Sequence, residues 1–504
     1  TLTSAWQMVP TQNYHNRIEK ISQINLDFRK IGNGFFGLFR ATLHILPDLS
    51  VNRIFQYVLR WRLLPRSACN FPHMSTGVLL RTLRSRREGL RNWKPGRLAR
   101  NTAWATFWQG VRLALQFAYL VLVARALGAE GYGLFSGVVA LAASLSPLVG
   151  LGFGVILVKE VSRTPDAFPC YWAKAIKVVA LSGPIMAAGV LLLAYMLLAI
   201  EGNWSVVILI AGAELVAMPF VAVASLAYQA HEQLSKTMLN HVQMNLARLT
   251  AIVIMLVAGR NSMLEFAAAY FGATAFAAGL SLIQVQRTFG APDWHAGPVA
   301  PHAREGGGYS LSMVITSAHA EIDKALLLRI SDTAATGIYS VASRLISAAS
   351  IPLITYVLAL TPRLFRAGNS GVNGGMQAAW KLFPPILLYG IPVGAVAYAF
   401  AGVLPIVFGE GFAASVPLVR MLAALPLLVG ISTLLLCILT CSGAQRVRVS
   451  LEFVALVFNI GLNAFLIPVL GAVGTVWAVL TSQFALCCLA AGAIFFSTRR
   501  GRPA

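Results

Sequence analysis

The feature that most constrains this chain is a succession of apolar stretches that runs from Trp104 to the C-terminus. Each stretch has about 20 residues, enough for a helix to cross roughly 30 Å of hydrocarbon. Only 12% of the residues are charged, whereas a soluble domain has about 25%, so little polar surface is left to face water. Membrane barrels show short alternating segments rather than continuous apolar runs. The sequence therefore predicts an all-α polytopic membrane protein.

About twelve transmembrane helices are expected after the first hundred residues. Their ranges are 103–124, 134–157, 175–200, 205–230, 239–258, 263–284, 309–330, 337–361, 380–407, 413–440, 447–468 and 472–496. With a cytoplasmic N-terminus, the inner loops and tail after residue 101 hold fifteen Lys and Arg residues. The outer loops hold three, namely Arg125, Arg260 and Arg329. This asymmetry is typical of cytoplasmic loops, so both termini are expected in the cytoplasm.

Residues 1–100 form a basic N-terminal extension that carries much of the formal net charge of +22. Residues 81–100 hold eight Lys and Arg residues and are expected to be a cytoplasmic juxtamembrane segment. Next to a span, such a cluster favours anionic lipid over nucleic acid as its partner. Residues 1–73 allow two interpretations, which are an over-extended gene model and an interfacial amphipathic helix near Gly34–Leu59.

The longest loop, 286–308, is polar and rich in glycine and proline, and it falls halfway along the spans. We therefore expect a cytoplasmic linker between two six-helix lobes, the N-lobe at 101–285 and the C-lobe at 309–498. Residues 499–504 are expected to be a basic cytoplasmic tail. Proline interrupts many of the spans, which suits a protein that changes shape, although kinked helices are common in membranes.

A local repeat supports the division into two lobes. Arg125-x7-Gly133-Leu-Phe-Ser aligns with Arg329-x7-Gly337-Ile-Tyr-Ser at a constant offset of 204 residues. Both copies lie where the first span of a lobe turns into its second. Because each lobe has an even number of spans, the repeat is parallel. Its two-fold axis is then expected to run along the membrane normal, with a substrate cavity between the lobes.

Four stretches together resemble a known family over about residues 100–500. They are 101–135, which includes Leu-Val-Ala-Arg125-Ala-Leu-Gly-Ala-Glu-Gly-Tyr-Gly, then Asp323-Lys with Thr-Gly-Ile-Tyr-Ser-Val-Ala-Ser at 336–343, then Leu-Pro-Ile-Val-Phe-Gly-Glu-Gly-Phe at 404–412, and Gly-Ala-Val-Gly-Thr-Val-Trp-Ala at 471–478. They are similar to polysaccharide and O-antigen flippases, the Wzx-like branch of the multidrug/oligosaccharidyl-lipid/polysaccharide exporter (MOP) superfamily. The N-terminal hundred residues fall outside this resemblance.

The resemblance implies a MATE-like, V-shaped pair of six-helix bundles that works by alternating access. It implies a cargo of sugars on undecaprenyl pyrophosphate, and a place in the bacterial inner membrane, where the protein would serve the synthesis of surface polysaccharides such as lipopolysaccharide O-antigen or exopolysaccharide. It also implies that polysaccharide polymerase and export proteins act beside this chain. The sugar itself is not specified by any residue.

Charged residues inside spans are costly, at roughly 2.5–3.5 kcal/mol each on the insertion scale, and usually functional. Five basic residues lie within the expected spans: Arg112, Arg248, Lys324, Arg344 and Arg420. A guanidinium matches phosphate oxygens in a bidentate manner. We therefore expect the first four to line the central cavity and hold the pyrophosphate headgroup. Arg420 is close enough to the outer end of its span to extend towards the interface.

Acidic residues and a histidine in the spans allow a second role. His319 precedes Asp323 by four residues, and Glu321 and Glu214 also lie in spans. Such groups would couple transport to H⁺ or Na⁺. The structural alternative is ion pairing, of Lys324 with Glu321 and of Arg344 with Asp323. Asn459 and Asn463 are expected either to join helices or to contact sugar.

Three function classes remain after these observations. The preferred one is a flippase, the first alternative is a cation-coupled multidrug exporter, and the second is a polysaccharide polymerase or ligase. The basic bias of the spans argues against a carrier of hydrophobic cations, and the short outer loops argue against an enzyme. No G-x-x-x-x-G-K-[ST] motif occurs, so ATP is not expected to drive the chain directly. No cofactor or metal is expected, because the cysteines lack ligand spacing.

Overall fold

The computed structural model describes residues 97–197, 203–260, 262–295, 297, 300–368, 376, 380 and 382–499. Every regular element in this part of the chain is helical. Residues 1–96 and 500–504 lie outside it, so the basic extension and most of the short C-terminal tail are not described. The predicted all-α polytopic fold is confirmed.

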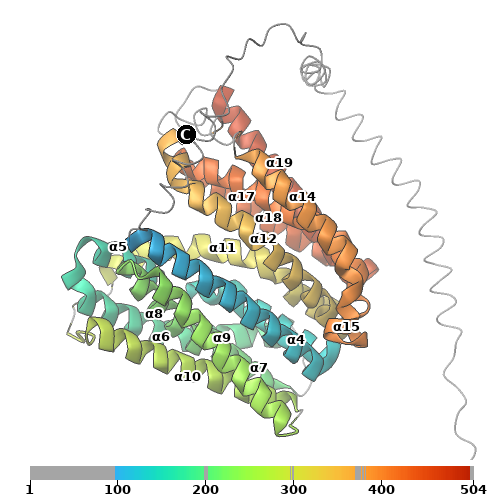
Figure 1. Cartoon of the computed structure of the whole chain (residues 1–504), viewed down its shortest axis with the longest axis horizontal. Coiled ribbons are helices and arrows are strands. Elements are labelled where there is room, and N and C mark those ends of the chain that lie inside the picture. Colours follow the sequence, from blue (N-terminus) through green and yellow to red (C-terminus); the bar gives the residue numbers. More distant parts are fainter. Residues whose placement is uncertain are drawn as a thin grey trace, which may run out of the picture. The chain divides into compact units, whose positions relative to one another are not determined.

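The first six spans are formed by seven α-helices and a π-helical turn. These are α4 (Arg97–Leu145), α5 (Phe153–Arg163), α6 (Phe168–Leu197), α7 (Trp204–Gly212), η3 (Ala213–Ala217), α8 (Met218–Ala230), α9 (Leu234–Val257) and α10 (Met263–Phe289). The last six are formed by α11 (Ala300–Ile330), α12 (Thr333–Gly368), α14 (Phe383–Phe400), α15 (Leu404–Phe408), α16 (Ser415–Leu422), α17 (Leu425–Cys441), α18 (Gln445–Leu470) and α19 (Ala472–Arg499). Figure 1 shows the two sets of helices.

Nine helical segments in the described residues are long and apolar enough to cross a membrane. The segment Thr106–Leu148 covers most of the expected span 103–124 and the first part of the expected span 134–157, which α4 joins at Gly128. The expected span 134–157 is interrupted after α4, and its last residues belong to α5. Gly128 has φ 65° and ψ −175°, a conformation that is essentially restricted to glycine. The spans in α9 and α11 are missing from the nine because polar and charged side chains interrupt them. With these three additions, the structure accounts for twelve spans.

Helices also extend beyond the apolar stretches that revealed them. The loop expected at 286–308 contains the end of α10 and the first turns of α11, which begins at Ala300. Hydropathy marks the part of a helix that lies in lipid, and a helix continues into water without any such signal. At this end, Gly152 packs against Gly306 so closely that an added Cβ would lie 2.3 Å from the Gly306 carbonyl oxygen.

The same junction carries an ion pair. Lys159 on α5 donates to Glu305 on α11, with 2.7 Å between Nζ and Oε1, and this hydrogen bond raises the pKa of the Lys159 ammonium. The first turns of α11 therefore pack on α5, and the main neighbours of the whole helix are α4 of the N-lobe and α18 of the C-lobe.

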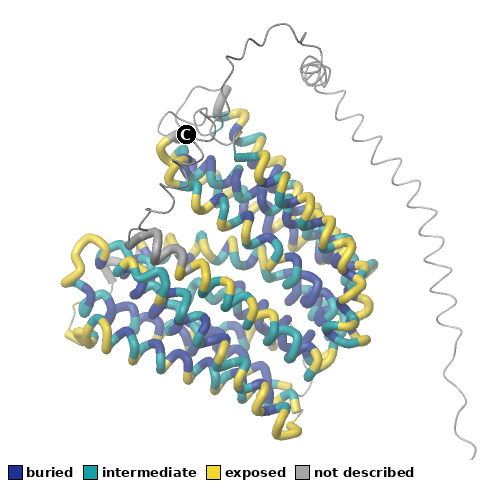
Figure 2. Tube along the Cα trace, in the orientation of Figure 1, coloured by how far each residue is buried: buried dark blue, intermediate teal, exposed yellow. Residues whose placement is uncertain are grey.

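Buried residues gather where helices face one another, and exposed residues lie on the outward faces (Figure 2). Many of the exposed side chains are large and apolar, for example Val257 at 84% and Leu388 at 78% exposure. In water such surfaces would favour aggregation, whereas lipid tails accept them. The apolar outward faces fit a multi-pass membrane protein.

The internal repeat brings its two copies into direct contact. A Cβ added to Gly133 on α4 would lie 1.7 Å from the Thr333 carbonyl oxygen, and one added to Gly337 on α12 would lie 2.0 Å from that of Ala129. One turn further on, Ser136 Oγ donates to Ser340 Oγ over 2.8 Å. Equivalent residues touch each other only near a two-fold axis. The axis of the repeat therefore passes through this α4–α12 crossing.

A second contact joins the lobes near the same turn. The Arg125 guanidinium donates to the carbonyl oxygens of Ile406 and Val407 in α15, at 2.6 and 2.7 Å. These carbonyls belong to the last turn of a helix, where the backbone lacks internal partners and favours a cation. Arg125 and its repeat equivalent Arg329 are both exposed. Among the described residues only Arg125 of the two makes such carbonyl contacts, so the two copies of the repeat differ at this arginine.

Candidate functional site

The charged residues inside the spans form two clusters, one in each lobe. In the N-lobe, Arg248 on α9 lies against Glu214 on η3, with 3.0 Å between Nη2 and Oε1. The Arg248 Nε donates to Thr274 Oγ1 over 3.0 Å, and its guanidinium stacks 4.3 Å from the centroid of the Tyr270 ring. The Tyr270 hydroxyl donates to the same oxygen of Glu214. Both ionic side chains are 11% exposed.

The backbone around Glu214 departs from regular α-helix. Ala213–Ala217 form a π-helical turn between α7 and α8. Pro219 follows it and has no amide hydrogen to donate to the carbonyl of Leu215, so the regular helical ladder is interrupted here. Gly183 on α6 packs against this carbonyl, since an added Cβ would lie 2.8 Å from the Leu215 oxygen. Wide turns of this kind often mark functional sites.

The C-lobe cluster is centred on Lys324, whose side chain is 2% exposed. Its Nζ lies 2.8 Å from the Glu321 carboxylate and 3.7 Å from that of Asp323. Asp323 also accepts hydrogen bonds from the Lys324 amide and from the hydroxyl of Tyr339 on α12. The structural alternative for Lys324, pairing with Glu321 one turn back, is therefore what the structure contains.

Arg344 on α12 lies between the two clusters. Glu321 on α11, Tyr132 on α4 and Glu214 on η3 are among the groups that act on it electrostatically. No carboxylate of the described residues lies within 4.0 Å of its guanidinium. The expected pair of Arg344 with Asp323 is therefore wrong, because Tyr339 and the Lys324 amide occupy the Asp323 carboxylate.

Taken together, the two clusters balance their charges. The cations are Arg248, Lys324 and Arg344, and the carboxylates are Glu214, Glu321 and Asp323. The basic excess expected from the sequence is therefore not realised in this central group. Low-dielectric surroundings explain the balance, since an unpaired charge there is expensive.

Arg112 on α4 stands apart from this group. Its Nε is buried and has no hydrogen-bond partner among the described residues. The imidazole of His241, on α9, is the ionisable group on which it acts. Arg112 is thus a guanidinium inside a span with no carboxylate within 4.0 Å in the described part of the chain.

His319 does not pair directly with Asp323. Its Nε2 lies 3.3 Å from the Oε1 of Gln483 on α19, and its buried Nδ1 has no partner among the described side chains. The four-residue spacing places both residues on one face of α11, but the imidazole turns to α19. His319 and Asp323 are therefore not in direct contact in this conformation.

The other span residues singled out in the sequence, Asn459, Asn463 and Arg420, each contact a neighbouring side chain. Asn459 on α18 donates to Ser482 on α19 over 3.0 Å and accepts from Asn463 at the same distance, as expected of residues that join helices. Arg420 is exposed, and its guanidinium lies 5.5 Å from the centroid of the Tyr398 ring. No group of three or more His, Cys, Asp or Glu side chains with metal-binding geometry occurs among the described residues.

Sequence reasoning missed the tyrosines. Tyr270 and Tyr339 each donate to a carboxylate, while the buried hydroxyl of Tyr119 has no partner in the described residues. The only available signal was the position of Tyr339 in the repeat, where the first copy has Phe135. A tyrosine in place of phenylalanine there indicated a hydroxyl that needs a buried partner.

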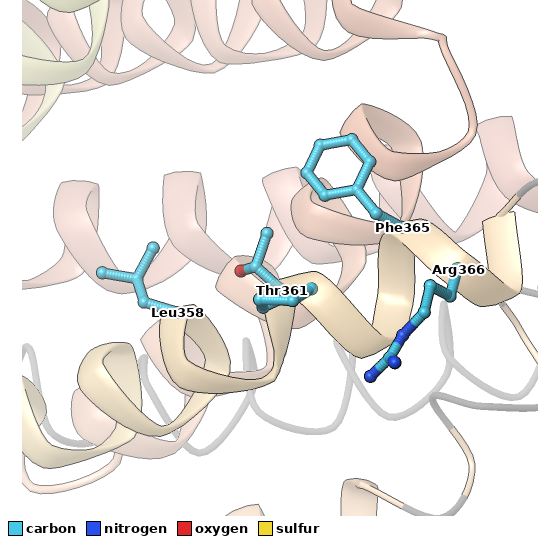
Figure 3. Close-up of a pocket in the computed structure, with 5 residues that line it drawn as sticks. Leu358, Thr361, Phe365 and Arg366 are labelled. Atoms are coloured by element: carbon cyan, nitrogen blue, oxygen red, sulfur yellow. The ribbon is translucent and has the colours of Figure 1, made fainter. Parts of the chain in front are cut away.

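A pocket of about 780 Å³ lies elsewhere, at the cytoplasmic end predicted for α12. Leu358, Thr361, Pro362, Phe365 and Arg366 line it, and all of them come from α12 (Figure 3). Thr361 is seventeen residues beyond Arg344, or about 25 Å along the helix axis. This pocket is therefore separate from the charged clusters.

Comparison with known proteins gives one family. Residues 98–367 match the family model described as polysaccharide biosynthesis protein. No curated protein sequence matches the chain.

Several solved structures share this fold at low sequence identity. An inward-facing multidrug resistance MATE family transporter of the MOP superfamily superposes with a TM-score of 0.60 at 14% identity, over 78% of this chain and 99% of the other. The lipid II flippase MurJ, in an inward closed conformation, gives 0.60 at 12% identity, over 77% and 86%. A MOP superfamily transporter from Pyrococcus furiosus, whose binding pocket is described as having reversed polarity, gives 0.55 at 14%, over 79% and 95%.

Proposed function

Because the chain belongs to the family of polysaccharide biosynthesis proteins and has the fold of MOP superfamily transporters, we propose that it is a flippase. Its cargo is a saccharide linked to undecaprenyl pyrophosphate, and it moves this lipid across the bacterial inner membrane by alternating access. The observation that carries the proposal is the presence of guanidinium groups inside the spans that no carboxylate neutralises within 4.0 Å among the described residues, at Arg112 and Arg344. A pyrophosphate offers these guanidiniums the direct charged hydrogen bonds that no carboxylate makes with them.

The central clusters support the same cargo. Arg248, Lys324 and Arg344 come from α9, α11 and α12, so they converge from both lobes. Convergence of this kind lets a bound headgroup contact both lobes at once, as alternating access requires. These three cations and Arg112 are the candidate ligands of the headgroup. The carboxylates Glu214 and Asp323 support coupling to H⁺ or Na⁺ as a further part of the proposal.

A transport assay with reconstituted vesicles tests the proposal. Vesicles that contain the full chain are loaded with an undecaprenyl-pyrophosphate oligosaccharide, and the fraction accessible at each leaflet is followed in time. We expect protein-dependent flipping of this lipid and no transport of small cationic dyes. If the dyes move and the lipid does not, a cation-coupled multidrug exporter replaces the flippase. Flipping that ignores both pH and Na⁺ gradients removes the coupling.

Cross-linking of the repeat axis tests alternating access. The Ser136 and Ser340 hydroxyl oxygens lie 2.8 Å apart, so the double variant Ser136→Cys with Ser340→Cys is expected to form a disulfide on oxidation. If this crossing parts during transport, the disulfide stops flipping, and a reductant restores it. The two single variants are the controls. Full transport by the cross-linked protein would show that the α4–α12 crossing stays closed throughout the cycle.

A further inference from the structure

We propose that Glu214 competes with the cargo for Arg248. Its carboxylate binds Arg248 when the transporter holds no cargo, and a phosphate of the cargo replaces it there. This inference rests on the proposed function and adds a specificity-determining residue to it. A competing carboxylate sets a threshold for binding. A pyrophosphate, with several negative charges, can displace it, whereas a headgroup with one negative charge gains little by the exchange.

The geometry of the Glu214–Arg248 contact allows a phosphate to replace the carboxylate. One carboxylate oxygen, Oε1, accepts from both Arg248 Nη2 and the Tyr270 hydroxyl. The guanidinium is therefore not engaged in the two-bond fork that makes arginine–carboxylate pairs strong. Its Nε is held by Thr274, and its Nη1 has no recorded polar partner among the described residues. A phosphate can thus bind this arginine while Thr274 keeps it in place.

The groups around Glu214 favour an anion in its position. Arg248 on α9, Tyr270 on α10, Tyr119 on α4 and Arg344 on α12 are the titratable or charged groups that interact with its carboxylate. Two of these four groups are guanidiniums, one from each lobe; Tyr270 donates its hydroxyl to Glu214, and the hydroxyl of Tyr119 has no partner among the described residues. An anion larger than a carboxylate, with more oxygens, can contact both guanidiniums.

The transport cycle explains why a competitor is needed. After cargo release, the empty protein must change conformation again, with Arg248 still inside the membrane. An unpaired guanidinium there is costly, and Glu214 removes that cost by taking the place of the phosphate. Glu214 lies in a π-helical turn and not in a regular α-helix. This irregular backbone allows its carboxylate to move away from Arg248 when cargo binds.

Two simpler roles for Glu214 predict different results. If Glu214 orients Arg248 for cargo, removing its charge weakens binding. If the pair only holds α9 against η3, binding does not change while stability falls. If Glu214 competes with cargo, removing its charge strengthens binding. The sign of the effect on anion affinity therefore distinguishes the three roles.

The experiment measures binding of undecaprenyl pyrophosphate and of phosphatidylglycerol, a lipid with one negative charge, to the full chain in lipid nanodiscs. For Glu214→Gln we expect affinity for both lipids to rise about tenfold or more, as removal of a competing charged hydrogen bond implies. Binding of phosphatidylglycerol then becomes detectable. Flipping of undecaprenyl pyrophosphate slows, because the cargo-free protein with an unpaired Arg248 changes conformation more slowly after release. Unchanged or weaker binding of undecaprenyl pyrophosphate overturns the proposal.

Glu265→Gln is the matched control. Glu265 on α10 pairs with Arg260 over 3.3 Å at an exposed site, so its loss is expected to leave lipid binding unchanged. If Glu214→Gln does not fold, as shown by its melting temperature, Tyr270→Phe decides the question. This variant keeps the ring under Arg248 and removes one donor that holds Glu214, so affinity is expected to rise by a smaller factor; an unchanged or lower affinity rejects the competitor role.

The outcomes separate this inference from the proposed function. If the wild-type chain binds no undecaprenyl pyrophosphate, and neither variant does, the cargo itself is wrong. If the wild-type chain binds it and Glu214→Gln binds it no better, the cargo stands and only the competitor role fails.

Discussion

Replacing Gly133 with leucine is expected to abolish the folded protein. A Cβ at this position would lie 1.7 Å from the Thr333 carbonyl oxygen and 2.8 Å from the Gly337 amide nitrogen, and both are backbone atoms. Overpacking of a flexible core typically costs about 1–3 kcal/mol, and a rigid backbone contact costs more. The α4–α12 crossing must then separate, which removes the contact between the lobes at the repeat axis. The yield of monodisperse protein in detergent and its melting temperature measure the effect.

Gly272→Leu on α10 is the control, because nothing lies within 4 Å of a Cβ added there. It is expected to leave both the yield and the melting temperature close to wild type. Gly337→Leu should resemble Gly133→Leu, since its Cβ meets the Ala129 carbonyl oxygen at 2.0 Å. A Gly133→Leu protein with normal stability would mean that the lobes do not meet at this crossing.

Lys324→Ala is expected to cause the second large loss. It leaves the carboxylates of Glu321 and Asp323 inside the membrane without the ammonium that lies 2.8 and 3.7 Å away. Removing one partner of a buried ion pair costs about 3–5 kcal/mol. We expect a lower melting temperature together with a loss of flipping, measured in the same preparation.

A double variant separates these two effects. Lys324→Met with Glu321→Gln removes one charge of each sign, so much of the stability is expected to return. Flipping is expected to stay low, because the ammonium that the proposal assigns to the headgroup is still missing. Recovery of both properties would reduce Lys324 to a structural role.

The fold was largely predictable because the membrane imposes a simple rule. A helix in lipid must be apolar over about 20 residues, so the spans appear directly in the sequence. The offset of 204 residues between Gly133 and Gly337 also predicted an internal repeat, and the structure brings both glycines together at the α4–α12 crossing. The segments hardest to recognise from hydropathy were those in α9 and α11, which carry Arg248 and Lys324. The charged and polar residues that lower the hydropathy of these two helices are also the candidate functional residues.

The pairing of charges was less predictable, because it depends on how helices rotate against one another. Lys324 and Glu321 are three residues apart on one helix, and local spacing predicted their contact correctly. The partner of Asp323 comes from α12, and the sequence alone does not decide between Tyr339 and Arg344 on that helix. Only the packing shows that Tyr339 takes this place. The Glu214–Arg248 pair spans 34 residues and has no local signal at all.

The initial rate at which Arg344→Gln flips an undecaprenyl-pyrophosphate oligosaccharide in reconstituted vesicles shows whether charges inside the membrane hold the cargo. Arg260→Gln, at an exposed arginine with a similar loss of charge, is the control. If Arg344 holds the headgroup, its variant loses about tenfold or more of the rate, as the loss of charged hydrogen bonds implies, and the control does not. Equal rates for wild type, Arg344→Gln and Arg260→Gln would contradict a cargo held by charges inside the membrane.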